Sequence, residues 1–444
     1  MSSEQSKIFL GNVIHCQRDP SRKQLYKISG EQQSFVIVKG NKIVATGKKE
    51  DLEQARAQHL ADEQDVMVVM LSDRQLLIPG LVDSHIHAPQ YPNCGLGYDK
   101  PLLDWLQAYT YKLERKYRDL EYSKKVFNAV VRKTLNHGTT TACYFASMFE
   151  DASMILVDAV IEHGQRAFVG KINMTTLAPD DYKETPEETI KLTRKFIEAV
   201  RSKNCDLVEP IITPRFALSL EMDSMVELGH LVKEYDVNVQ THISENQDEV
   251  KEVNKKYGIQ YANVYDEAGL LTPKTVLAHG IYLSDEELSL LRQRGSSVSH
   301  CPDSNTCLKS GMCDVRRLFN FGIKVGLGTD VSGGPSPSIV SAMRSALATS
   351  INLSFSQKNY KPLNYMDVFY LATLGGAEAL SLDHKIGNFE VGKEFDALVV
   401  DMGAENCNTD MLLDCSPLEL LQKFIYTGDD RNISNVFVAG KSVK

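Results

Sequence analysis

The sequence of 444 residues predicts an α/β protein, a (β/α)8 TIM barrel with a small β-sandwich domain built from both chain termini. Three observations predict this fold. Short apolar runs alternate with helical stretches from about residue 76, eight such runs can be distinguished, and both ends of the chain are rich in β-forming residues. Eight strand–helix units are the number that closes such a barrel. We expect residues 1–75 and 385–444 to form the small domain and residues 76–384 the barrel.

The chain ends carry the β pattern. Residues 34–39 are β-rich, Gly40-Asn41 forms a turn, and residues 42–45 continue as the second strand of a hairpin. Near the C-terminus, residues 394–401 and 435–438 have the same character. We expect these segments to pair beside the barrel.

The predicted barrel strands are short and apolar, at residues 76–82, 139–145, 167–172, 208–212, 237–241, 275–278, 296–299 and 323–327. Helix signals lie between them. Thr185-Pro186-Glu187-Glu188 is a capping box with proline at the first helical position. Ser284-Asp285-Glu286-Glu287 begins another helix, which Gly295 ends.

Polar side chains follow several of these strands, where a barrel places its active site. His85 and His87 follow the first strand, and alternate positions of an extended segment share a face. The later strands end in His242, His279, His300 and Asp330. The other six of the 11 histidines are interpreted as structural or surface residues.

Three imidazoles and a carboxylate suit a divalent metal such as Zn²⁺ or Fe²⁺. We predict that His85, His87, His242 and Asp330 hold one ion per chain, zinc by preference and Fe²⁺ as the alternative, with one position left for water. A bound metal lowers the pKa of water from 15.7 to about 7.

Three residues are candidate catalytic groups. Asp330 can take the proton of the water, Glu245 lies three residues after His242 and can carry a proton to a substrate, and His279 can orient the water. The alternative for Glu245 is a solvated carboxylate at a helix start. For His300 we favour the structural interpretation, with Pro302 fixing the turn.

Charge and cysteine content exclude several classes. The net charge is −9 and no long basic run occurs, which argues against nucleic acid as a partner. No apolar run is long enough to span a bilayer, and the polar N-terminus has no signal-peptide core. Nine scattered cysteines without Cys-x-x-Cys indicate reduced thiols. We therefore expect a cytoplasmic protein that does not bind membranes.

The motifs together resemble the amidohydrolase superfamily. The resemblance rests on residues 79–87, which contain His-x-His, on Gly328-Thr329-Asp330, and on residues 389–397. It narrows to the members of that superfamily that deaminate guanine, through residues 87–91, 101–105, 138–146, 213–216, 242–246 and 428–433. It covers the chain from about residue 77, whereas the first 75 residues match only in general β character.

The resemblance implies hydrolysis at C2 of guanine to give xanthine and ammonia, a step of purine catabolism, in a cytosolic homodimer. It implies that Glu245 protonates the ring and then the leaving amine, and that Gln90, Arg215 and Phe216 contact the purine. Arg215 offers donors to the 6-oxo group, Gln90 a donor and an acceptor, and Phe216 a stacking face. The alternatives are core packing for Phe216 and a surface ion pair for Arg215.

Two details qualify the match. The fourth strand leads into Pro214-Arg215, with no lysine where relatives with two metals carry a carbamylated one, so we expect a single ion. Pro89 stands where a small polar residue is more familiar, and this affects the expected geometry of Gln90.

Three other functions are weighed against this one. A pterin such as 7,8-dihydropterin carries the same 2-amino-4-oxopyrimidine edge, and the loop near Tyr91 and Trp105 would decide between the rings. A noncatalytic scaffold would be expected to lack metal ligands or Glu245, and all are present. The nucleic-acid base deaminases carry Pro-Cys-x-x-Cys, whereas this chain has Cys301-Pro302 in the reverse order.

Overall fold

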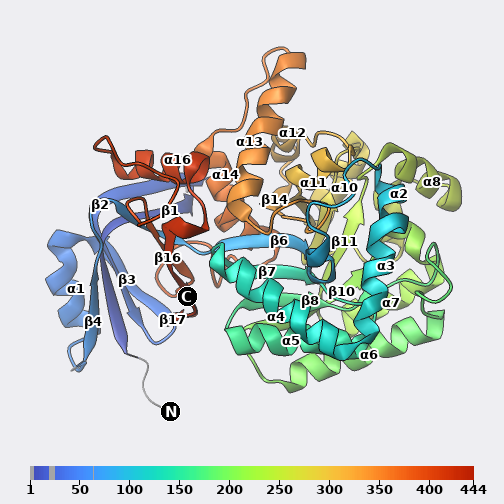
Figure 1. Ribbon diagram of the computed structural model, residues 1–444, viewed down its shortest axis with the longest axis horizontal. Helices are drawn as coiled ribbons and strands as arrows, with labels where there is room; N and C mark the ends of the chain where they lie inside the picture. Colours follow the sequence, from blue (N-terminus) through green and yellow to red (C-terminus); the bar gives the residue numbers. More distant parts are fainter. Residues whose placement is uncertain (1–4, 20–25, 64) are drawn as a thin grey trace.

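The computed structural model describes residues 5–19, 26–63 and 65–444, and it confirms the predicted fold class. A parallel barrel surrounded by helices lies beside a smaller β-rich part to which both ends of the chain contribute (Figure 1). Within the described residues, none of the helices has both the length and the apolar character that a membrane span requires.

Eight parallel strands form the barrel, in the order β14-β13-β12-β11-β10-β8-β7-β6. They are β6 (Leu81–His87), β7 (Thr139–Phe145), β8 (Arg166–Gly170), β10 (Val208–Pro214), β11 (Asn238–Ile243), β12 (Thr275–His279), β13 (Ser297–His300) and β14 (Lys324–Leu327). The short β9 (Ile172–Asn173) pairs with β10. Backbone bonds from Asp330 N–H to the His85 carbonyl (2.9 Å) and from His87 N–H to the Val331 carbonyl (3.1 Å) join the two ends of the sheet.

Helices cover the outside of the barrel (Figure 1). Those between or after its strands are α2 (Leu102–Trp105), α3 (Tyr111–Glu114), α4 (Leu120–Asn136), α5 (Glu150–His163), α6 (Pro186–Ser202), α7 (Met222–Tyr235), α8 (Gln247–Tyr257), α9 (Tyr261–Glu267), α10 (Asp285–Arg294), α11 (Pro302–Cys307), α12 (Val315–Asn320), α13 (Ile339–Ser356), α14 (Tyr365–Ala372) and α15 (Leu374–Ala379). Both predicted capping boxes are confirmed, at Thr185 before α6 and at Ser284 before α10. Gly295 ends α10 at φ +73°, a left-handed conformation that glycine adopts without steric cost.

The two chain ends form one mixed sheet in the order β17-β16-β15-β5-β1-β2-β3, with β4 paired to β1. Its strands are β1 (Ser6–Arg18), β2 (Tyr26–Lys39), β3 (Lys42–Lys48), β4 (Val66–Met70), β5 (Gln75–Pro79), β15 (Ala397–Asp401), β16 (Ile433–Val438) and β17 (Lys441–Ser442). Helices α1 (Leu52–His59) and α16 (Pro417–Thr427) accompany it. The β2–β3 hairpin about Gly40 confirms the predicted turn.

The predicted first barrel strand, residues 76–82, is wrong as one element. The apolar run divides at Gly80. Residues before it form β5, which pairs with β1 and β15, and residues after it begin β6. A Cβ on Gly80 would lie 2.0 Å from Oγ1 of Thr140, so only glycine fits where the chain passes from one sheet to the other. The domain ranges 1–75, 76–384 and 385–444 stay a prediction.

His15 connects the N-terminal and C-terminal parts of the chain within the small domain. It is buried in β1, and its Nδ1 accepts a hydrogen bond from the backbone N–H of Phe389 (3.1 Å). Burial lowers the pKa of His15 to about 4, because a charged imidazole loses its hydration there.

We therefore expect this histidine to make stability depend on pH. Its folded pKa lies below the unfolded value of about 6.5, so its contribution is complete above pH 6.5 and is lost as the pH falls toward 4. The loss over this window is about 3 kcal/mol. Thermal unfolding at pH 7 and pH 5 should show a smaller change of Tm in His15→Gln than in the wild type. Equal changes of Tm would contradict the assignment.

Candidate active site

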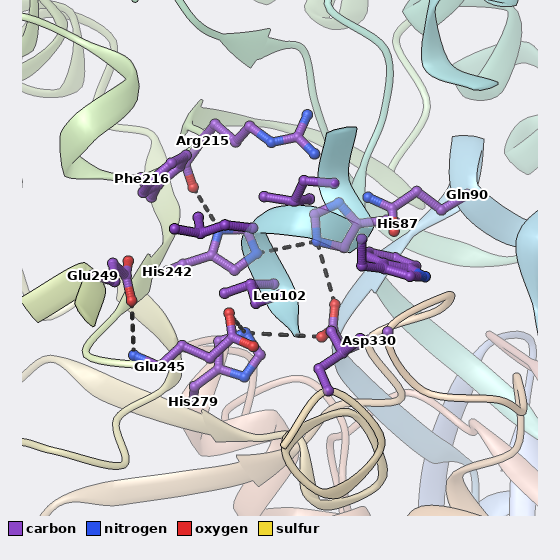
Figure 2. Close-up of a pocket in the computed structure, with 15 residues that line it drawn as sticks. His87, Gln90, Leu102, Arg215, Phe216, His242, Glu245, Glu249, His279 and Asp330 are labelled. Carbon is purple, nitrogen blue, oxygen red and sulfur yellow. Dashed lines mark hydrogen bonds and ion pairs between the residues drawn. The ribbon is translucent and has the colours of Figure 1, made fainter. Parts of the chain in front are cut away.

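Four side chains converge at the C-terminal end of the barrel as a candidate metal centre. His85 and His87 come from β6, His242 from β11 and Asp330 from the loop after β14. Figure 2 shows His87, His242 and Asp330 pointing toward one another. Their ligand atoms all lie within 4.8 Å of one another. Oδ1 of Asp330 is 3.2 Å from Nε2 of His85 and 3.3 Å from Nε2 of His87, and Nε2 of His87 is 3.1 Å from Nε2 of His242.

The protonation of this cluster suits a cation. Burial lowers the pKa of His85, His87 and His242, so the three imidazoles are neutral. Burial alone would raise the pKa of Asp330, but the imidazole of His85, whose Nε2 lies 3.2 Å from the carboxylate, outweighs burial and the pKa is lowered. Nε2 of His85 is buried without a hydrogen-bond partner. Three neutral nitrogens, one carboxylate and an unsatisfied buried nitrogen fit a divalent ion that accepts N and O ligands.

Two neighbours fix the orientation of the ligands. The Nδ1 of His242 donates to the backbone carbonyl of Arg215, which turns Nε2 toward the centre. Asp83, buried in β6, accepts bonds from the backbone N–H groups of His85 (3.2 Å) and Thr329 (3.0 Å). Burial raises the pKa of Asp83 to about 7. Asp83 thus links the strand that carries two ligands to the loop that carries the fourth.

A carboxylate–imidazole–carboxylate array lies beside the centre. Nε2 of His279 is 3.4 Å from Oε2 of Glu245 and 3.8 Å from Oδ2 of Asp330. Burial, helped by the nearby carboxylates Asp330 and Glu249, raises the pKa of Glu245 to about 7. Burial alone would lower the pKa of His279, but the charges of Glu245 and Asp330 outweigh it and the pKa is raised. Near neutral pH such a glutamate can both accept and donate a proton.

Three further side chains hold this array in place. Oδ1 of Asn305 lies 2.8 Å from Nδ1 of His279, and Oγ of Ser310 donates to Glu245 (2.9 Å). Glu249, in the capping box of α8, accepts the backbone N–H of Glu245 (3.1 Å). The sequence pattern did not identify these three residues, because none of them lies directly at the end of a predicted strand.

The backbone is strained at the same place. Ser244, His279 and Asp330 have φ values of +48°, +74° and +44°. Left-handed conformations at non-glycine residues cost of order 1–3 kcal/mol each and concentrate at functional sites. Here they turn two acid–base candidates, His279 and Asp330, toward the centre.

The three residues expected to contact a purine lie on the other side of the same cavity. Gln90, Arg215 and Phe216 all line it, and all are buried (Figure 2). The surface ion pair considered for Arg215 is wrong, because its side chain is only 3% exposed. Its partner is Glu114, whose Oε2 lies 2.6 Å from Nη1. Sequence reasoning did not identify Glu114, which lies 101 residues from Arg215 in the short α3 and carries no motif.

The cavity has a volume of about 50 Å³. Its polar lining is formed by His87, Gln90, Arg215, His242, Glu245, Glu249, His279 and Asp330, and His85 does not line it. Its apolar lining is formed by Phe216, Leu102, Leu103, Trp105, Leu106 and Leu308. A flat heteroaromatic ring with polar edges matches such a pocket. His300 is buried at the end of β13, and burial lowers its pKa to about 3; it does not line the cavity.

Comparison with known proteins assigns this chain to a family. The model of the amidohydrolase family matches residues 76–443, and the chain belongs to that family. The relatives it resembles are guanine deaminases. It is 48% identical to the guanine deaminase of Homo sapiens over 382 residues, which cover 84% of each chain. It is 41% identical to that of Dictyostelium discoideum, over 99% of this chain and 98% of the other.

A solved structure agrees with these relatives. The crystal structure of the guanine deaminase from C. acetobutylicum, with guanine bound in its active site, superposes with a TM-score of 0.89 at 34% identity. The superposition covers 99% of this chain and 100% of the other. The similarity therefore extends over the small sheet as well as the barrel.

Proposed function

We propose that this protein is a guanine deaminase, which hydrolyses guanine to xanthine and ammonia. The observation that carries the proposal is that one cavity joins the metal-ligating cluster, the Glu245–His279–Asp330 array and the Gln90–Arg215 pair. The identity of 41–48% to guanine deaminases over most of the chain supports the same activity.

The metal we propose is one Zn²⁺ per chain, with Fe²⁺ as the alternative, held by His85, His87, His242 and Asp330. Such an ion would lower the pKa of water to about 7 and so supply the nucleophile. The fourth strand offers no lysine to bridge a second ion, because it ends at Pro214 and leads into Arg215.

The side chains divide the proton transfers between them. The oxygen of water bonds to C2 of guanine, and the bond from C2 to the amino nitrogen breaks. Glu245, protonated at the start, delivers its proton to the ring nitrogen beside C2 while Asp330 accepts the first proton of water. Glu245 then takes the second proton of water from the added oxygen and delivers it to the departing amine, and the proton on Asp330 returns to Glu245 to restore the site. His279 lies between the two carboxylates and stabilises their charge.

The purine is held by its oxo edge and its face. Arg215 has donors only and matches the 6-oxo group, Gln90 offers both a donor and an acceptor, and Phe216 offers a ring face. Adenine presents an amine where guanine presents an oxygen, so it would leave without an acceptor the N–H donors of Arg215 that Glu114 does not bind. Such an unpaired group costs roughly 1–3 kcal/mol or more.

A substrate panel tests the proposal. Metal-replete protein is given guanine, 7,8-dihydropterin, adenine and cytosine, and ammonia release is followed. We expect turnover of guanine in preference to the other three. Preferred turnover of the pterin would assign the site to the other ring that shares the 2-amino-4-oxopyrimidine edge, and release from none would contradict the enzyme assignment.

The role of Arg215 has its own test. Replacing Arg215 alone would strand the buried Glu114 carboxylate, which is strongly destabilising, so Arg215→Met is combined with Glu114→Gln. We expect the affinity for hypoxanthine, which carries the 6-oxo group, to fall by about 10- to 100-fold, because a hydrogen bond to a charged group contributes roughly 1.5–3 kcal/mol. Unsubstituted purine, which lacks the oxygen, should change little. Calorimetry measures both; equal losses would contradict recognition of the oxo group by Arg215.

We further propose a homodimer that acts in the cytoplasm in purine catabolism, without nucleic-acid or membrane partners. Exposed apolar side chains on α13 and α16, Ile351, Phe355 and Tyr426, supply apolar surface of the kind that subunits bury. Light scattering of the purified protein measures the mass, and a monomer at micromolar concentration would contradict the dimer.

A further inference from the structure

One buried carboxylate, Glu114, holds both polar side chains that face the purine in the proposed function. Its oxygens accept bonds from Nη1 (2.6 Å) and Nη2 (3.2 Å) of Arg215 and from Nε2 of Gln90 (3.0 Å). The hydroxyl of Tyr182 adds a fourth bond at 2.9 Å. Glu114 is 1% exposed and is absent from the residues that line the cavity, so it acts from behind them.

Glu114 determines which way the amide of Gln90 points. An ionised carboxylate only accepts hydrogen bonds, so the amide nitrogen of Gln90 must face Glu114. The backbone N–H of Ser332 only donates, and it reaches Oε1 of Gln90 at 3.3 Å. Both neighbours therefore select the same orientation. Each end of the amide keeps one hydrogen-bonding position for a ligand.

Glu114 also determines what Arg215 can bind. A guanidinium is always charged, and two contacts to one carboxylate fix its plane. The ring of Tyr111, 5.2 Å from the guanidinium carbon, lies against it. With its charge already compensated, Arg215 retains N–H donors for a neutral oxygen. An anionic group in the same place would meet the negative charge of Glu114 directly behind the guanidinium.

We propose that Glu114 is a positioning and specificity residue: it orients Gln90 and compensates Arg215, so that the cavity accepts a base with a neutral oxo group and rejects the same ring with an anionic group at that position. The inference rests on the proposed function for the identity of the ring. Glu114 does not touch the substrate, yet it is the residue that makes the cavity reject an anionic group at this position.

The binding of two purines distinguishes the proposed positioning role of Glu114 from a merely structural one. Hypoxanthine carries a neutral 6-oxo group, and purine-6-carboxylate carries an anion at the same carbon. Calorimetry on metal-replete wild type should show preference for hypoxanthine. In Glu114→Gln the guanidinium charge is uncompensated, so the affinity ratio should shift toward the carboxylate by at least about tenfold, since like-charge contacts cost several kcal/mol. An equal loss for both ligands would overturn the proposal, because general loosening of the site does not favour the anion.

Glu378→Gln is the matched control. Glu378 is also a buried glutamate that accepts bonds from an arginine, Arg18 (2.7 Å), and from a tyrosine, Tyr370 (2.5 Å), but it does not line the cavity. This variant should leave the ligand ratio unchanged, and a shift equal to that of Glu114→Gln would overturn the proposal.

A second variant covers the case in which Glu114→Gln does not fold. Glu114→Asp keeps the charge and withdraws it by one methylene, so it should weaken hypoxanthine binding while still rejecting the carboxylate. Acceptance of both ligands by this variant would overturn the proposal. Neither ligand carries a 2-amino group, so the result does not depend on turnover. If the wild type rejects purine-6-carboxylate but does not hydrolyse guanine, the result contradicts the proposed function and leaves the role of Glu114 standing.

Discussion

Glu245→Gln should retain the metal and bind guanine but lose most of its turnover. The amide preserves the shape of the side chain and can still accept the hydrogen bond from Ser310. It removes the titratable proton of a group whose pKa burial raises to about 7. General acid–base catalysis contributes about 10²–10⁴-fold, and this glutamate serves two transfers in the proposed reaction. We therefore expect kcat to fall by at least about 10²-fold, with KM changed far less. Steady-state kinetics and elemental analysis measure both points.

Glu287→Gln provides the control for this prediction. Glu287 is equally buried, at 5% exposure, and belongs to the capping box of α10, but it does not line the cavity. It should keep near-normal kcat. Near-normal turnover in metal-replete Glu245→Gln would exclude this residue as the proton carrier.

The positions of the candidate ligands could be predicted because, in a barrel, the place of a residue relative to a strand in the sequence indicates where that residue lies in the fold. Parallel strands of a barrel end at one face, so a polar residue directly after an apolar run is placed without further information. His242 and His85 are far apart in the chain, yet each follows a strand, and the structure brings them together. The same reasoning placed Glu245, His279 and Asp330 in one cavity.

The supporting residues could not be predicted in this way. Glu114 lies in a four-residue helix within the long connection from β6 to α4, and its partners depend on how that connection folds. Asn305 and Ser310 lie after β13 in a segment without a periodic pattern. Hydrogen-bond partners that only the tertiary fold brings together produce no recognisable spacing pattern in the sequence.

The division at Gly80 was missed for a different reason. A strand buried in the small sheet and a strand buried in the barrel have the same apolar composition, so residues 76–82 read as one strand. The change of sheet depends on the close approach of Thr140, a residue of the neighbouring strand. The Pro79-Gly80 pair predicts an interruption of the strand. Which sheet each segment joins depends on its pairing partners, which are β15 for β5 and β7 for β6.

Removal of two ligands should have the largest effect of all. In the double variant His85→Ala, His87→Ala, only His242 and Asp330 remain at the centre. Two ligands do not fill the tetrahedral set that zinc requires. We expect purified protein to lose its stoichiometric metal and its guanine turnover together, whereas wild type should contain one divalent ion per chain. Elemental analysis measures the metal directly, without reference to activity.

The matched control is His300→Asn, since His300 is another buried histidine at the end of a barrel strand, outside the cluster. It should keep the metal. Stoichiometric metal in the double variant would overturn the ligand assignment, and two ions per wild-type chain would overturn the single-ion site. The expectation of one ion follows from the chain itself: the candidate cluster supplies three imidazoles and one carboxylate, a complete set for one five-coordinate ion that also binds water. His279, the remaining nearby imidazole, is already engaged by Asn305, Glu245 and Asp330.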